Sequence, residues 1–137
     1  MSEVRLDQLG KAIERLRESL AASQAEPGNL MYRDSVIKRF EFTFEIAQSV
    51  LRKFVTAYSV NLKEPERITF PTLIRTASQD GLVREGYDVW MSYREARNRT
   101  SHTYNEDQAL AVVAIVPRFL EEAAFLYSRL CEEMGNE

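Results

Sequence analysis

Apolar side chains recur at spacings of three and four residues along two long segments, and this periodicity is the strongest constraint on the fold. The first segment runs from about Ser2 to Gln24 and carries Leu6, Leu9, Ile13, Leu16 and Leu20. The second runs from about Met31 to Tyr58 and carries Phe40, Phe44, Ala47, Leu51, Phe54 and Tyr58. Such spacing places apolar side chains on one face of an α-helix, so both segments are predicted to be helices of a bundle.

Additional apolar residues widen the stripe of the second predicted helix until much of its circumference is apolar. A helix of this kind packs on more than one side or lies at a subunit interface. We therefore expect it to be the central helix. Its broad apolar face, with Phe40, Phe42 and Phe44, also favours a homodimer.

Prolines, glycines and capping residues predict where the other helices begin and end. The run Thr69-Phe70-Pro71 follows a polar connection over Asn61–Arg67 and opens a short helix, because the first helical turn does not need the N–H that proline lacks. Gly81 is expected to close this helix as a C-terminal cap. A third main helix is predicted from about Val83 to Arg99.

The last helix is predicted to begin after Asn105, whose side chain can accept hydrogen bonds from the first turn. Pro117 lies inside this segment and is expected to kink the helix near Val113. The predicted fold is therefore all-α: an antiparallel up-and-down bundle of four helices with one additional short helix. A single domain is expected to span residues 1–137.

Composition limits the classes of function that are open to the chain. Charged residues in every apolar stretch exclude a membrane span, and the single cysteine, Cys131, excludes a disulfide framework. The formal charge of −3 argues against a non-specific nucleic-acid coat, because such binding relies on many Lys and Arg residues. We expect a cytoplasmic protein without a metal site or a bound cofactor.

The eleven residues from Arg94 to Tyr104 combine side chains that carry chemistry. They include the only histidine, His102, with Arg97 and Asn98 before it and Tyr104 after it. The three arginines Arg94, Arg97 and Arg99 form a local basic cluster, so Arg94 and Arg99 are candidate contacts to RNA or a nucleotide. Arginine donates bidentately to phosphate oxygens, and histidine moves protons near neutral pH. The combination indicates phosphodiester or phosphoryl chemistry.

Helical geometry limits how Arg97 and His102 can act together. On a continuous α-helix the two side chains would lie about 140° apart around the axis. They can share a ligand if the helix ends between them, or if a second subunit supplies its own copy of the motif. Metal-free RNA cleavage needs both a base and an acid, which one histidine does not easily provide in one step. A symmetric homodimer with two copies of His102 is the economical solution, and a strictly monomeric form would then be inactive.

A structural interpretation of the same residues is also open. A lone histidine near a helix end is often a cap on terminal carbonyls, and arginine-rich segments are usually solvated. Glu41 and Glu45 could be paired carboxylates, but they are better explained as partners of Arg39, Lys38 or an arginine of the motif. Trp90 and Tyr93 fit a core position better than a role in base stacking.

Arg97-Asn98-x-x-x-His102 resembles the Arg-polar-x(3)-His signature of the HEPN superfamily, and His102-x-Tyr104 extends it as in the HepT-like members. The segments Arg33–Glu45 and Ala96–Asn105 are similar to the family of nucleotidyltransferase substrate-binding proteins. The resemblance covers essentially the whole chain. It implies a bundle of four to five antiparallel helices that dimerises, with the Arg and His motifs of both subunits lining one cleft. It also implies a minimal nucleotidyltransferase as partner.

Two functions are attached to proteins of this kind. In one, the protein is a metal-independent RNase toxin, and the partner is an antitoxin that adenylylates the tyrosine of His-x-Tyr. The resemblance then implies that Arg97 stabilises the scissile phosphate, His102 transfers protons, Asn98 orients the site and Tyr104 is modified. In the other, the protein is a non-catalytic substrate-binding subunit of a two-component nucleotidyltransferase.

The intact Arg97–His102 pair favours the RNase, whereas the acidic net charge favours the binding subunit. A purely structural bundle would be supported if Arg97 and His102 were buried and paired only within their own chain.

Overall fold

The chain forms a bundle of α-helices in a computed structural model that describes residues 4–62 and 68–135. Its elements are α1 (Asp7–Ala25), α2 (Leu30–Tyr58), α3 (Phe70–Gln79), α4 (Tyr87–Arg99), the 3₁₀ helix η2 (Thr100–His102) and α5 (Glu106–Gly135). The described residues contain no β-strand, so the predicted all-α fold with one additional short helix is confirmed. Of the predicted polar connection Asn61–Arg67, residues 63–67 lie outside the described part.

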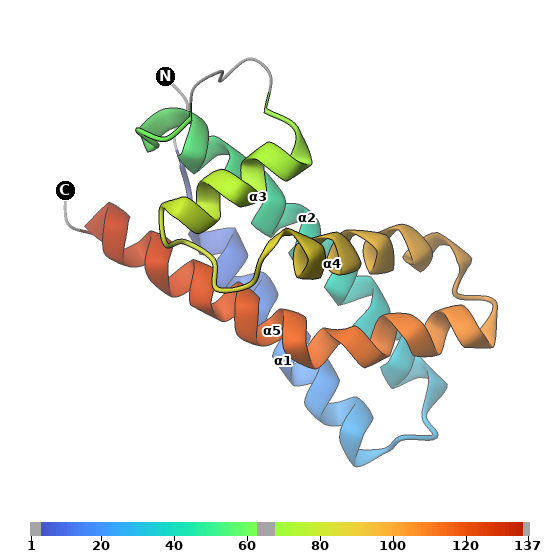
Figure 1. Cartoon of the computed structure of the whole chain (residues 1–137). Helices are drawn as coiled ribbons and strands as arrows, with labels where there is room; N and C mark the ends of the chain where they lie inside the picture. Colours follow the sequence, from blue (N-terminus) through green and yellow to red (C-terminus); the bar gives the residue numbers. More distant parts are fainter. Residues whose placement is uncertain (1–3, 63–67, 136–137) are drawn as a thin grey trace.

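Helix α2 occupies the centre of the bundle, as the width of its apolar stripe predicted. It packs against α1, α3, α4 and α5 and also contacts η2. Figure 1 shows α2 between these elements, with α1 and α5 on one side and the shorter α3 and α4 on the other. None of the helices in the described ranges is long and apolar enough to cross a membrane.

Five aromatic side chains from three helices form the middle of the hydrophobic core. Phe119 of α5 lies edge-on to Phe40 of α2, with ring centroids 5.1 Å apart, and to Tyr93 of α4 at 5.3 Å. Trp90 packs edge-on against Tyr93, with ring centroids 5.4 Å apart, and its ring centroid lies 6.3 Å from that of Phe44. Edge-to-face pairs are worth about 0.5–1.5 kcal/mol beyond their buried area. The core positions expected for Trp90 and Tyr93 are confirmed, since both side chains are fully buried.

The same packing corrects part of the expectation for the apolar face of α2. Phe40 and Phe44 are buried in the core of their own subunit, so they are not available to a second copy. Phe42 points away from that core and is 52% exposed. Of the three phenylalanines, only Phe42 can contribute to an interface.

A buried carboxylate binds the backbone of the segment that precedes α4 in the sequence. Glu122 of α5 is fully buried and accepts a hydrogen bond of 2.9 Å from the indole N–H of Trp90. It also accepts from the backbone N–H of Glu85 at 2.8 Å and of Arg84 at 3.2 Å. Because these backbone groups are bound to Glu122, the helix does not begin at Val83 as predicted. It begins at Tyr87, and Val83 is an apolar anchor of the preceding loop.

Side-chain caps define the starts of α3 and α5. Thr69 Oγ1 accepts from the backbone N–H of Thr72, and Asn105 Oδ1 accepts from that of Asp107 at 2.9 Å. Gly81 has a φ of +73°, a conformation that other residues rarely adopt, so its predicted capping role is confirmed. The predicted start of the first helix at Ser2 was too early, because Val4, Arg5 and Leu6 are not helical and α1 begins at Asp7.

Pro117 lies inside α5, as predicted. Proline cannot donate to the carbonyl of Val113, so this helix lacks one internal hydrogen bond. Figure 1 shows the axis of α5 changing direction in the middle of the helix.

Replacing Glu122 with glutamine tests how much this carboxylate contributes to stability. The amide keeps one acceptor oxygen but turns an NH₂ group toward N–H donors, so we expect Glu122→Gln to lower the free energy of unfolding by about 2–4 kcal/mol. Urea denaturation followed by circular dichroism measures the change. The neighbouring Glu121 is exposed, so Glu121→Gln should change stability by less than about 0.5 kcal/mol. Equal stability of the two variants would contradict the role of Glu122.

Candidate functional site

The end of α4 separates Arg97 from His102, which is one of the two arrangements the sequence left open. Helix α4 ends at Arg99, and the hydroxyl of Thr100 donates to the carbonyl oxygen of Arg97 at 2.7 Å. The chain then tightens into η2, and the backbone N–H of Asn105 donates to the carbonyl oxygen of His102 at 3.1 Å. Because these groups bind the terminal carbonyls, the chain leaves the helical path within the motif.

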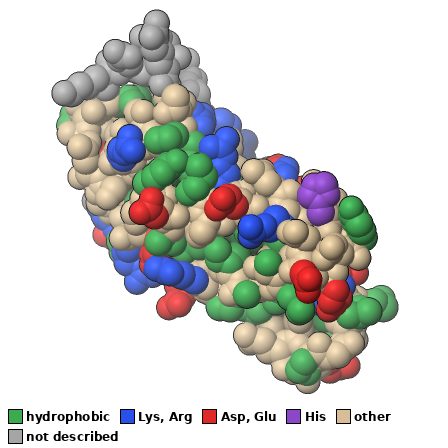
Figure 2. Space-filling model, turned by 45° about the vertical axis from the view of Figure 1, so that its right-hand side comes forward, with side chains coloured by type: hydrophobic (Ala, Val, Ile, Leu, Met, Phe, Trp, Pro, Cys, Tyr) green, Lys and Arg blue, Asp and Glu red, His purple; other side chains and the backbone are tan. Residues whose placement is uncertain are grey.

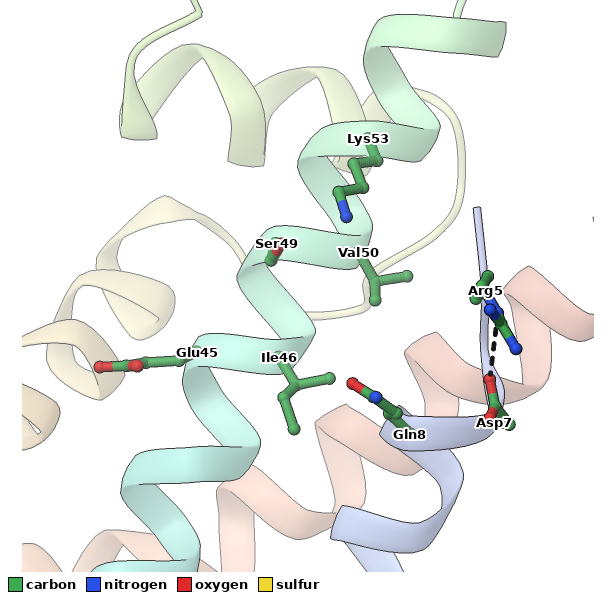
Figure 3. Close-up of a pocket in the computed structure, with 8 residues that line it drawn as sticks. All are labelled: Arg5, Asp7, Gln8, Glu45, Ile46, Ser49, Val50 and Lys53. Carbon is green, nitrogen blue, oxygen red and sulfur yellow. Dashed lines mark ion pairs between the residues drawn. The ribbon is translucent and has the colours of Figure 1, made fainter. Parts of the chain in front are cut away.

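Arg97 is held against α2 by two carboxylates. Its Nε donates to Glu45 Oε1 at 2.8 Å, and its Nη2 contacts both Glu45 and Glu41, the latter at 3.4 Å. Figure 3 shows Glu45 extending from α2 away from Ile46 and Gln8, toward the side where α4 lies. Pairing of Glu41 and Glu45 with a motif arginine, the preferred explanation from the sequence, is confirmed.

The contacts to α2 leave one edge of the Arg97 guanidinium for a ligand. The Nη1 group has no hydrogen bond to any described residue, and 27% of the side chain is exposed. A guanidinium donates through several N–H groups in a fixed plane, so carboxylates can occupy one edge while a phosphate oxygen occupies another.

His102 and Tyr104 lie on the surface beyond α4. The ring of His102 is roughly perpendicular to that of Tyr104, with centroids 6.4 Å apart. Tyr104 is 89% exposed, which leaves its phenol accessible to another protein. The histidine, purple in Figure 2, stands on a surface that also carries basic and acidic side chains.

The structure does not bring all the predicted site residues into contact. No hydrogen bond joins Arg97, Asn98 or His102 to one another among the contacts of the described residues. The bond considered between Asn98 and His102 required the α-helix to continue to His102, and it ends at Arg99. The condition for a purely structural motif is not met, because Arg97 pairs with its own chain but is only partly buried, and His102 is exposed.

Arg94, Arg97 and Asn98 line a groove between α2 and α4, whereas Arg99 does not. The groove has a volume of about 380 Å³, and its other wall includes Gln48, Ser49 and Arg52 of α2. The sequence interpretation missed these three residues. They could have been found as polar residues at spacings of three and four within an otherwise apolar helix, continuing the line of Glu41 and Glu45.

An ion pair fixes the start of α5 next to α2. Arg33 Nη1 donates to Glu106 Oε1 at 2.7 Å, and this hydrogen bond raises the pKa of Arg33 above its ordinary value. Glu106 follows Asn105 directly, so the pair limits the movement of the segment that carries His102 and Tyr104. The described residues contain no group of three or more His, Cys, Asp or Glu side chains suited to a metal ion.

The chain is similar to known proteins over most of its length. The family model described as nucleotidyltransferase substrate binding protein like matches residues 4–132. A curated Haemophilus influenzae protein, probable ribonuclease HepT, is 33% identical over 94 residues, which are 69% of this chain and 64% of that protein. The match therefore spans slightly less than two thirds of that relative.

Two solved structures share the fold. One, from Haemophilus influenzae, is described as revealing the fold of a substrate binding domain of a nucleotidyltransferase. It has a TM-score of 0.83 and 26% identity, over 92% of this chain and 98% of that chain. A protein from Thermus thermophilus has a TM-score of 0.71 and 28% identity, over 89% and 98% of the two chains. With the family model matching nearly the whole sequence, this chain belongs to the family of nucleotidyltransferase substrate-binding-like proteins.

Proposed function

We propose that this protein is a metal-independent RNase, the toxin of a toxin–antitoxin pair in which a minimal nucleotidyltransferase regulates it by adenylylation. The observation that carries the proposal is the arrangement at the end of α4. Arg97 is held with one donor edge open, and His102 stands exposed just beyond the helix. The similarity to a protein named probable ribonuclease HepT supports the same chemistry.

Each side chain of the motif has a defined role in this proposal. Arg97 binds the scissile phosphate and stabilises the charge that grows on it in the transition state. His102 takes the proton of the 2′-hydroxyl or returns a proton to the leaving 5′-oxygen. Asn98 orients the substrate beside Arg97, and Arg94 and Arg99 contact the RNA backbone.

A homodimer completes the proposed site, because acid and base catalysis then use two copies of His102. Exposed apolar residues near the site support such an interface. Leu30 and Met31 at the start of α2 are 58% and 81% exposed, and Leu110 in the first turns of α5 is 53% exposed. The Arg33–Glu106 ion pair brings these two helix ends together. Their apolar surface lies on the part of the molecule that carries the motif, where a second copy would have to dock.

RNA cleavage in EDTA tests the proposed chemistry. The wild type should degrade total cellular RNA, whereas His102→Ala and Arg97→Ala should each lose activity by at least roughly 100-fold. Their melting temperatures should change little, because His102 is exposed and partly exposed ion pairs are worth less than about 1 kcal/mol. Cleavage that survives in both variants would show that a contaminant or another site is responsible.

Adenylylation of Tyr104 is tested with the minimal nucleotidyltransferase and ATP. The phenol oxygen attacks the α-phosphorus, pyrophosphate leaves, and the phenolic proton passes to a base of the partner or to water. Mass spectrometry should show adenylate on the wild type and on Tyr58→Phe, a control at a tyrosine that is 47% exposed. Tyr104→Phe should stay unmodified, keep its RNase activity and escape inhibition. Adenylate on Tyr104→Phe would refute this assignment.

The non-catalytic substrate-binding subunit is the second candidate function. Two observations favour it: Glu41 and Glu45 offset the charge of Arg97, and a structural relative is described as a substrate binding domain of a nucleotidyltransferase. If the folded, dimeric wild type cleaves no RNA in the EDTA experiment, this candidate replaces the RNase.

A further inference from the structure

Apart from Phe44, the side chains that line the groove between α2 and α4 are polar, whereas two packed helices normally face each other with apolar side chains. On α2, Gln48, Ser49 and Arg52 come three, four and seven residues after Glu45, so the four side chains lie on one face. On α4, Arg94, Arg97 and Asn98 form the facing stripe in the same way. Two opposed polar stripes with about 380 Å³ between them are suited to a polar ligand.

The groove is basic although the chain as a whole is acidic. Its lining contains three arginines, Arg52, Arg94 and Arg97, and one carboxylate, Glu45, and a second carboxylate, Glu41, contacts Arg97 from beside the groove. The whole chain carries −3. Even with both carboxylates counted, the arginines leave this groove with a net positive charge, so an anionic ligand fits it.

Two guanidinium groups mark the end of the groove that lies away from Glu45. Arg52 Nη1 donates to the carbonyl oxygen of Ile68 at 2.7 Å, and the guanidinium of Arg94 lies 4.9 Å from the ring centroid of Phe70. Because Ile68 and Phe70 are two residues apart, both cations are held near the start of α3. Each is fixed through one contact and keeps other N–H donors for a ligand.

We propose that this groove binds the phosphates of single-stranded RNA that flank the scissile phosphate at Arg97. Arg94 and Arg52 hold the neighbouring phosphate groups, and Gln48, Ser49 and Asn98 donate to phosphate or ribose oxygens. The groove thus extends the RNA path from the motif along α2, within one subunit. The inference rests on the proposed RNase function, because it takes the substrate of that site as its ligand.

RNA binding by the purified protein at several salt concentrations tests this inference. A fluorescent single-stranded oligoribonucleotide is titrated in EDTA, with every variant made in the His102→Ala background to prevent cleavage. Removing one phosphate contact should reduce the slope of log K against log salt concentration by about 0.7. Arg52→Gln and Arg94→Gln should each show this reduction and weaken binding by roughly tenfold to a hundredfold, the scale of one lost charge-assisted contact.

Two further variants separate ligand binding from a purely structural role. Arg52→Lys keeps the positive charge but loses the planar guanidinium, so it should retain most of the salt slope. Gln48→Glu adds a negative charge in the groove with almost no change of shape, and it should weaken RNA binding at low salt. Arg17→Gln is the control, because Arg17 is an exposed cation of α1 that pairs with Glu14 and does not line the groove.

The outcomes distinguish this inference from the function on which it rests. If the parent His102→Ala protein binds no RNA, the proposed function fails and the groove proposal fails with it. If it binds RNA but Arg52→Gln and Gln48→Glu match Arg17→Gln, only the groove proposal is refuted. Binding of ATP that depends on Arg52, combined with RNA binding that does not, would also overturn it and indicate a mononucleotide site.

Discussion

The hydrogen bond from Trp90 to the buried carboxylate of Glu122 sets the rotation of α4, and the position of the candidate site depends on that rotation. Residues seven apart on an α-helix lie only about 20° apart around its axis. Arg97 is seven residues after Trp90, so fixing the indole toward α5 and Phe44 also directs Arg97 toward α2. Phe44 packs on Trp90, and the next residue, Glu45, receives Arg97. The same alignment of α2 and α4 therefore produces both the core contact between Phe44 and Trp90 and the polar contact between Glu45 and Arg97.

Beyond Arg97, polar side chains of the motif itself decide how the chain continues. The hydroxyl of Thr100 and the side chain of Asn105 bind backbone groups that a longer helix would have used. The helix therefore stops between the arginine and the histidine, and the two side chains belong to different local structures. One subunit supplies an anchored cation and an exposed titratable ring without direct contact between them. This incomplete arrangement is the physical reason to place a second copy of the motif in the proposed active site.

The sequence predicted features that depend on local chemistry and missed those that depend on distant partners. Helix type, the Asn105 and Gly81 caps and the central position of α2 follow from spacing and from single residues. The start of α4 could not be predicted, because Arg84 and Glu85 donate to Glu122, nearly forty residues later. From the sequence alone, Glu122 would be assigned to the surface, because its hydrogen-bond donors Arg84, Glu85 and Trp90 are known only from the structure. In the candidate site, the segment Arg94–Tyr104 was evident from the sequence. Gln48 and Arg52 were not, because they lie in α2, whose residues were interpreted as part of the core.

The pairing of Arg97 with Glu41 and Glu45 bears on how an acidic protein could act on RNA. These carboxylates reduce the net charge at the proposed scissile position, yet they also hold the plane of the guanidinium in the absence of substrate. A preorganised donor avoids reorganisation in the transition state, which is where electrostatic catalysis gains most. In the proposed mechanism, the cations that attract the substrate are Arg52 and Arg94 in the groove, which are not paired with carboxylates in this way. Because screening limits exposed charges to about 8–10 Å in physiological salt, that local field matters more to a docked phosphate than the net charge of the chain.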